Sequence, residues 1–231
     1  MKSDMTSKAV MTAILALASF ACIGLALAPR PAAAAFDGPD PARNDLRDLK
    51  VGMSVAELPS KGYVELFCAK NPDQKLTSWS EYTRCSPDEQ GRYDIRFKFD
   101  ESTNILSPLD DKYSGTKVGG HPVILTLMIG SAARVTGLDI KTDPKARLSL
   151  RKRAFLLATQ AMNFYGSDGW KCEGRHPDGE EAPIGNVFID QRCEKVLPQR
   201  KVIVERRFFR PADADIRNMV STSEITVLNG N

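Results

Sequence analysis

Apolar and polar residues alternate along several short segments of the chain, which is the pattern of half-buried β-strands. The segment 93–99 is the clearest case, with three apolar residues on one face and Arg96 and Lys98 on the other. Further strands are predicted over the segments 63–68, 78–85, 122–129, 134–140, 169–172, 186–193, 201–209 and 224–228. Short strands separated by turn-forming residues favour an antiparallel sheet.

A short helix is predicted near the start of the folded region. Ser54 followed three residues later by Glu57 makes a capping box, in which each side chain satisfies a backbone N–H of the first helical turn. Pro59 follows closely and would clash with the preceding turn, so we expect a helix of about one turn.

A long helix is predicted over residues 144–165. Asp143 is a natural N-cap and Gly166 a natural stop, and apolar residues recur at helical spacing in the C-terminal half. The first half instead carries a cluster of basic residues, namely Lys145, Arg147, Arg151, Lys152 and Arg153.

The two halves of the folded region, residues 49–142 and 143–231, share an order of elements. Each has a capped helix, an aromatic residue, a cysteine, a loop, a second cysteine and an apolar strand. We therefore predict an α+β fold in which antiparallel sheet is backed by helices. Two tandem disulfide-containing modules and one continuous domain remain open as arrangements.

The first 35 residues have the three parts of a secretory signal peptide: a basic start, an uncharged run from Ala9 to Ala28, and a small-residue cleavage region ending at Ala34 or Ala35. Residues 36–48 are poor in apolar side chains and are predicted to form a flexible tether. The alternative is an uncleaved anchor in the inner membrane. A cleaved signal predicts a periplasmic or secreted protein.

Removal of the leader changes the charge of the chain. It takes three of 32 basic and one of 29 acidic residues, leaving 29 basic and 28 acidic residues and a net charge of +1. Nucleic-acid binding requires the neutralisation of several phosphates at once, so a nearly neutral chain argues against that class of partner.

Four cysteines remain after the leader is removed: Cys68, Cys85, Cys172 and Cys193. An even number in an exported protein predicts disulfides, and three pairings are possible. Local pairing would close loops of 16 and 20 intervening residues, each worth about 3 kcal/mol in chain-entropy models. The spacing does not fit a zinc site.

No recognisable catalytic, cofactor or metal motif occurs, so we assign no catalytic or metal-binding residue and expect no cofactor. The loop that contains His176, Asp178, Glu180 and Glu181 is the best place for an alternative, an envelope hydrolase or metal-binding protein that uses carboxylate oxygens.

Two groups of residues are candidates for an interaction surface. Trp79 and Tyr82, placed on opposite faces of the strand predicted for 78–85, would supply one core residue and one anchor for a partner. The basic start of the long helix would supply Arg147, Arg151, Lys152 and Arg153, which suit an acidic partner or anionic lipid.

The segment 49–100 resembles the superfamily that joins SmpA/OmlA-type small outer-membrane lipoproteins with the secreted beta-lactamase inhibitor protein. The shared features are Gly52-Met53-Ser54 opening a helix, then Gly62 and Cys68, and then Trp79, Tyr82 and Cys85. The resemblance implies a helical element packed on an antiparallel sheet, and a non-enzymatic protein that grips another protein with its sheet face.

These observations predict an exported, non-catalytic interaction or binding module of the bacterial cell envelope. Its partner would be another envelope or secreted protein, with anionic lipid as the alternative.

Overall fold

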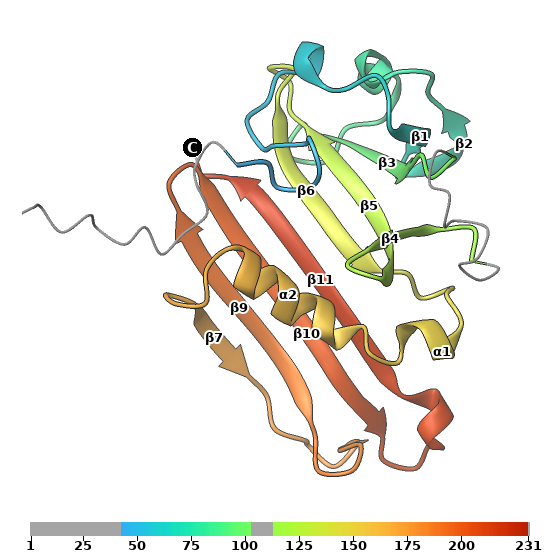
Figure 1. Cartoon of the computed structure of the whole chain (residues 1–231), viewed down its shortest axis with the longest axis vertical. Helices are drawn as coiled ribbons and strands as arrows, with labels where there is room; N and C mark the ends of the chain where they lie inside the picture. The colour runs from blue at the N-terminus through green and yellow to red at the C-terminus, as the bar shows by residue number, and fades with distance from the viewer. Residues whose placement is uncertain (1–42, 103–112, 231) are drawn as a thin grey trace, which may run out of the picture. The chain divides into compact units, whose positions relative to one another are not determined.

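An antiparallel sheet dominates the computed structural model, which describes residues 43–102 and 113–230 (Figure 1). The first half supplies β1 (Tyr63–Cys68), β2 (Asn71–Lys75), β3 (Tyr93–Phe99), β4 (Thr116–Val118), β5 (His121–Ile129) and β6 (Val135–Thr142). The second half supplies β7 (Lys171–Gly174), β8 (Glu181–Ala182), β9 (Ile189–Leu197), β10 (Arg200–Pro211) and β11 (Val220–Asn229). The helical elements are the 3-10 helices η1 (Val55–Glu57), η2 (Trp79–Arg84) and η4 (Ile216–Asn218) and the α-helices α1 (Leu148–Arg151) and α2 (Phe155–Phe164).

The strands of both halves belong to the same sheet. Its order is β2-β1-β3-β5-β6-β11-β10-β9-β7, with β4 added to β5 and β8 to β10. The halves meet where β6 pairs with β11, over a register that runs from Gly137 opposite Leu228 to Lys141 opposite Glu224. An antiparallel sheet accompanied by helices and two disulfides is an α+β fold, as the sequence predicts.

One face of this sheet forms the core. Along β5 the residues Leu125, Leu127 and Ile129 are fully buried, whereas the residues between them are only partly buried. The same alternation continues through β6, β11 and β10, because side chains of neighbouring strands that lie opposite one another point to the same face. The period-2 pattern of the sequence is therefore the signature of this one-sided burial.

The strand predicted for residues 78–85 is wrong, because this segment forms η2. Side chains three residues apart lie on the same side of a 3-10 helix, so Trp79 and Tyr82 both turn toward the core. Trp79 is buried and donates its indole N–H to the carbonyl of Pro59. The ring of Tyr82 packs edge-on against Tyr93. The capping box at Ser54 and Glu57, by contrast, is confirmed at η1.

The single helix predicted for residues 144–165 is also wrong, because the chain forms α1 and α2 with a break between them. The hydroxyl of Ser223, from β11, donates to the carbonyl of Ala154 at 2.8 Å and accepts the N–H of Ala158 at 3.1 Å. It thus occupies the place of a regular helical hydrogen bond, and such an insertion bends a helix. The predicted stop at Gly166 is correct, since this glycine adopts a positive φ just after α2.

The flexible tether predicted for residues 36–48 is wrong for its described part, residues 43–48. The carboxylate of Asp45 is buried, lies 2.8 Å from Nε of Arg200 and accepts the N–H of Val51 at 2.8 Å. The hydroxyl of Tyr165 donates to the same carboxylate. Burial raises the pKa of Asp45, and the hydrogen bonds from Val51 and Tyr165 and the charge of Arg200 oppose this rise. One buried ion pair between segments far apart in sequence therefore holds a stretch whose composition is typical of a linker.

The signal peptide predicted for residues 1–35 lies outside the described residues.

The four cysteines form two local disulfides, Cys68–Cys85 and Cys172–Cys193. The first joins the end of β1 to the end of η2 in the core, and the second joins directly opposite residues of β7 and β9. Such bonds persist in oxidising compartments outside the cytoplasm. Within residues 43–102 and 113–230, no helix combines the length and the apolar character needed to cross a membrane.

Ser223→Ala tests the link between α2 and the sheet. The substitution leaves the buried carbonyl of Ala154 and N–H of Ala158 without their shared partner, so we expect the free energy of unfolding to fall by about 1 to 3 kcal/mol in urea titrations. Thr222→Ala, one residue away on the same strand, removes no hydroxyl hydrogen bond among those described and serves as the control, with an expected loss of no more than about 1 kcal/mol. Equal losses in the two variants would show that the Ser223 hydroxyl has no special role.

Candidate functional site

The face of the sheet that points away from the core is the candidate functional site. On β10, Arg206 reaches Thr159 of α2 and the ring of Phe208 lies 4.5 Å from Phe155, so these positions face the helix. Their neighbours Glu205 and Arg207 point to the other side. We call this other side the open face. The strand registers place six of its residues in one row across the sheet: Arg96, Thr126, Asp139, Thr226, Ile203 and Glu194.

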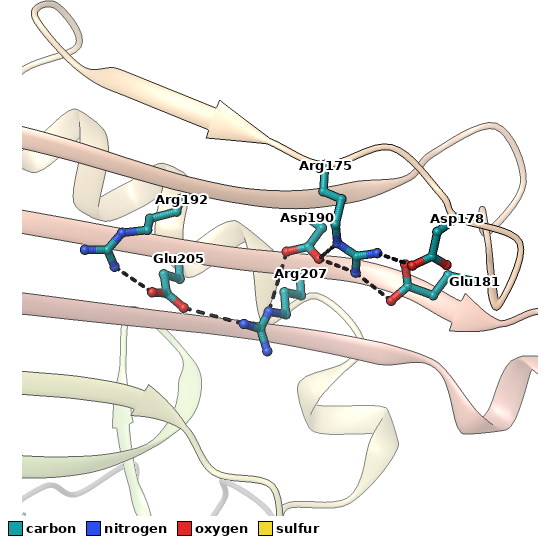
Figure 2. A network of polar contacts seen from close by, with 7 residues as sticks. All are labelled: Arg175, Asp178, Glu181, Asp190, Arg192, Glu205 and Arg207. Carbon is teal, nitrogen blue, oxygen red and sulfur yellow. Dashed lines mark hydrogen bonds and ion pairs between the residues drawn. The ribbon is translucent and has the colours of Figure 1, made fainter.

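Arg175 is the first member of a series of alternating charges at the β7 end of the open face (Figure 2). Its guanidinium lies 3.0 Å from Asp178, 2.7 Å from Glu181 and 2.7 Å from Asp190. These contacts raise the pKa of Arg175, through Glu181 first and then Asp190. Three carboxylates, from the loop between β7 and β8, from β8 and from β9, are thus gathered around one cation.

The series continues across β9 and β10. Arg207 lies 3.6 Å from Asp190 and 3.7 Å from Glu205, and Arg192 lies 2.7 Å from Glu205 (Figure 2). Arg192 also contacts Glu194 at 2.6 Å, and Lys201 contacts the same carboxylate at 2.8 Å. We call the whole series the charged ladder: Asp178, Glu181, Arg175, Asp190, Arg207, Glu205, Arg192, Glu194 and Lys201.

The charged ladder fixes the pattern of charge on the surface more than it stabilises the fold. Its arginines are 44 to 53% exposed, and exposed ion pairs contribute little because water and salt screen them. Six of its nine members nevertheless contact two or more side chains of opposite charge, which restricts their rotamers: Arg175, Asp190, Arg207, Glu205, Arg192 and Glu194. The open face therefore presents ordered charges of alternating sign.

An apolar strip, which consists of Met128, Leu228 and Val196, lies beside the charged ladder. The side chains of Met128 and Leu228 close over Gly137, where an added Cβ would lie only 2.8 Å from the sulfur of Met128. In the next two strands the same row continues with Lys201 and then Val196, whose surface is 78% exposed. Lys201 therefore separates the half-buried side chains of Met128 and Leu228 from Val196, a highly exposed apolar side chain at the β9 end of the row.

Asp139 is a titratable group in the middle of the open face. Its carboxylate accepts a hydrogen bond from Thr226 at 3.0 Å, but burial raises its pKa to about 6 and the charge of Glu224 adds to the rise. Lys141 opposes this effect, and Asp94 contributes to it. Asp139 is thus ionised at neutral pH only at a cost in stability.

Two of the three carboxylates proposed for a hydrolase or metal site form ion pairs. Asp178 and Glu181 contact Arg175, whereas His176 and Glu180 are exposed. Within the described residues, no group of three or more His, Cys, Asp or Glu side chains is arranged to hold a metal ion. The loop instead forms one end of the charged ladder.

The structure separates the residues that the sequence analysis selected for an interaction surface. Trp79 belongs to the core, and Tyr82 packs partly against it, so the prediction that they lie on opposite faces of a strand is wrong. Of the basic residues, Arg147, Lys152 and Arg153 are exposed, whereas Arg151 donates to the carbonyl of Ala146.

The charged ladder was missed, although the sequence carries a signal for it. Every second residue of β9 from Asp190 to Glu194 is charged with alternating sign, and Glu205 and Arg207 repeat the pattern on β10. Alternating charges on the outward positions of neighbouring strands indicate cross-strand ion pairs. The register that pairs them cannot be read from either strand alone.

Known proteins give no further guide to this site. Comparison with protein-family models found no match, and comparisons with curated proteins and with solved structures found none either.

Asp139→Asn tests the titration of the open face. A carboxyl group whose pKa is about 6 in the folded protein and 3.8 otherwise stabilises the fold at low pH, and this contribution is lost as the pH rises from about 4 to about 6. We therefore expect the stability advantage of the wild type over Asp139→Asn to shrink across this range, by about 1 to 3 kcal/mol in urea titrations. Glu173→Gln, an exposed acid on β7, is the control. A difference between wild type and Asp139→Asn that stays constant from pH 4 to 7 would contradict the assignment.

Proposed function

We propose that this protein is an exported, non-catalytic interaction module of the bacterial cell envelope, and that it presents the open face of its sheet to a protein partner. The observation that carries the proposal is the combination, on one face, of a partly exposed apolar strip with a charged ladder of fixed geometry. Protein interfaces combine these elements, with apolar contacts at the centre and polar groups around them.

The rigidity of the open face supports binding rather than mere exposure. Its side chains project from neighbouring strands with a register fixed by backbone hydrogen bonds, and Arg175, Arg192 and Arg207 each contact at least two carboxylates. A surface that is ordered before binding loses less conformational entropy when a partner arrives. An ordered sheet face is therefore suited to a preformed binding site.

The charge pattern favours a partner whose surface charges alternate in the complementary order. The charged ladder contains four cations and five anions and so has almost no net charge. It therefore attracts neither polycations nor polyanions such as nucleic acid. Its selectivity would come from position, because a partner with charges out of register would meet like charges.

The disulfides support a site outside the cytoplasm. Each half of the folded chain carries one local disulfide, and both halves would present their strands as parts of one face, with α2 behind the second half. This arrangement agrees with what the resemblance to the SmpA/OmlA and beta-lactamase inhibitor superfamily implies, a protein that grips another with its sheet.

Val196→Arg combined with Arg207→Glu tests the proposed interface. Both side chains are more than half exposed, so the fold should tolerate the change, while a partner loses an apolar contact and meets a reversed charge. We expect in-cell cross-linking followed by purification from the envelope fraction to recover a protein partner with the wild type, and at least about tenfold less of it with the variant.

The matched control is Ile216→Arg combined with Arg217→Glu on η4, where an exposed apolar residue and an exposed arginine are also adjacent. This variant should retain the partner. Failure of the wild type to recover any specific protein, or equal recovery by wild type and the Val196/Arg207 variant, would overturn the proposal.

A further inference from the structure

A cavity of about 480 Å³ lies where β3 and β5 separate beyond their paired region. Two segments that are distant in sequence form its walls, residues 113–116 before β4 and residues 143–150 around the start of α1. The hydroxyl of Tyr113 donates to the carboxylate of Asp143 at 2.6 Å and thereby joins the walls. The volume is in the range of small-molecule sites.

Residues 113–116, which form one wall of the cavity, are anchored to β3. The N–H of Phe99 donates to the hydroxyl of Thr116 at 3.0 Å, and Lys98 donates to the carbonyl of Ser114 at 3.2 Å. The cavity is therefore built by specific hydrogen bonds from described residues and is not a gap between loosely packed loops.

Positive charge dominates the lining. Arg96, Lys98, Lys145 and Arg147 line the cavity, whereas Asp143 is the sole carboxylate among its described lining residues. Asp143 already accepts hydrogen bonds from Tyr113 and from the N–H of Lys145. Lys98 is paired with Glu65, but no ion pair among the described residues involves the other three cations.

Arg96 carries an additional sign of an absent partner. Its Nε–H is buried and has no hydrogen-bond partner among the described residues. A buried donor without a partner is costly, so nearly all such groups in folded proteins are satisfied. An arginine kept in this position at a cost in stability is what a binding site requires when its ligand supplies the missing acceptor.

We propose that this cavity binds a multiply charged oxyanion, a phosphate or sulfate group carried by a small molecule or by a lipid headgroup. Two guanidinium groups can each bind such an anion through paired N–H donors, and the two lysines add charge without demanding a fixed geometry. The site gives a role to Lys145 and Arg147, two members of the basic cluster at the start of the predicted long helix. Arg96 belongs to the open face, but none of the residues that line the cavity belongs to the charged ladder or to the apolar strip, so the cavity can be tested separately from the proposed protein interface.

Arg96→Met and the double variant Lys145→Gln with Arg147→Gln test the site. The probes are pyrophosphate in solution, measured by calorimetry, and vesicles that contain phosphatidylglycerol, measured by co-sedimentation. The control is Lys152→Gln with Arg153→Gln, which removes the same charge from exposed residues outside the cavity. We expect both cavity variants to bind at least about tenfold more weakly than wild type and the control to bind like wild type.

The two probes separate the sources of the anion. Binding of pyrophosphate with this variant pattern identifies a soluble ligand, and binding of vesicles alone with the same pattern identifies a lipid headgroup. Absence of binding to either probe, or equal loss in the cavity and control variants, would overturn the proposal. Arg96→Met should also unfold at a temperature no lower than wild type, because it removes the unpartnered buried donor, and a marked fall would show that Arg96 has a structural role instead.

Discussion

The pairing of β6 with β11 is the constraint on which the rest of the structure depends. Beyond the last paired residues, the hydroxyl of Thr142 accepts the N–H of Ser223 at 2.8 Å and donates to its carbonyl at 3.1 Å, while the hydroxyl of Ser223 holds α2. The first half, the second half and the helix thus meet at two buried side chains. Because this junction extends the sheet without a change of face, core residues of both halves share one side and the open face runs across the other.

One-sided burial explains how a nearly neutral chain obtains a structured polar surface. Apolar packing on the core face sets the register, and the register in turn places the charges of β9 and β10 opposite charges of the other sign. The ion pairs are consequences of the sheet more than causes of it, which agrees with their exposure. A surface fixed in this way is available for recognition without any local stabilisation by a ligand.

The sequence predicts local features of this fold and misses those set by distant residues. Alternation identifies β3, a short apolar run identifies β5, the pair Ser54 and Glu57 identifies η1, and cysteine parity indicates the disulfides. The break between α1 and α2 escapes prediction because the hydroxyl that causes it belongs to Ser223, 65 residues after Ala158. The burial of Asp45 escapes for the same reason, since Arg200 lies more than 150 residues away in the chain. The sequence predicts a sheet face that binds a partner, but it does not show which residues form that face, because strand register determines them.

Native-state hydrogen exchange is the most direct measurement of whether the two halves form one cooperative sheet. If the β6–β11 pairing joins them, the backbone amides of β5 and β10 should exchange with the same free energy of opening, and with the same dependence on added denaturant. Complete exchange of the β5 amides while those of β10 remain protected, or the reverse, would contradict a single sheet and would show two modules that open separately.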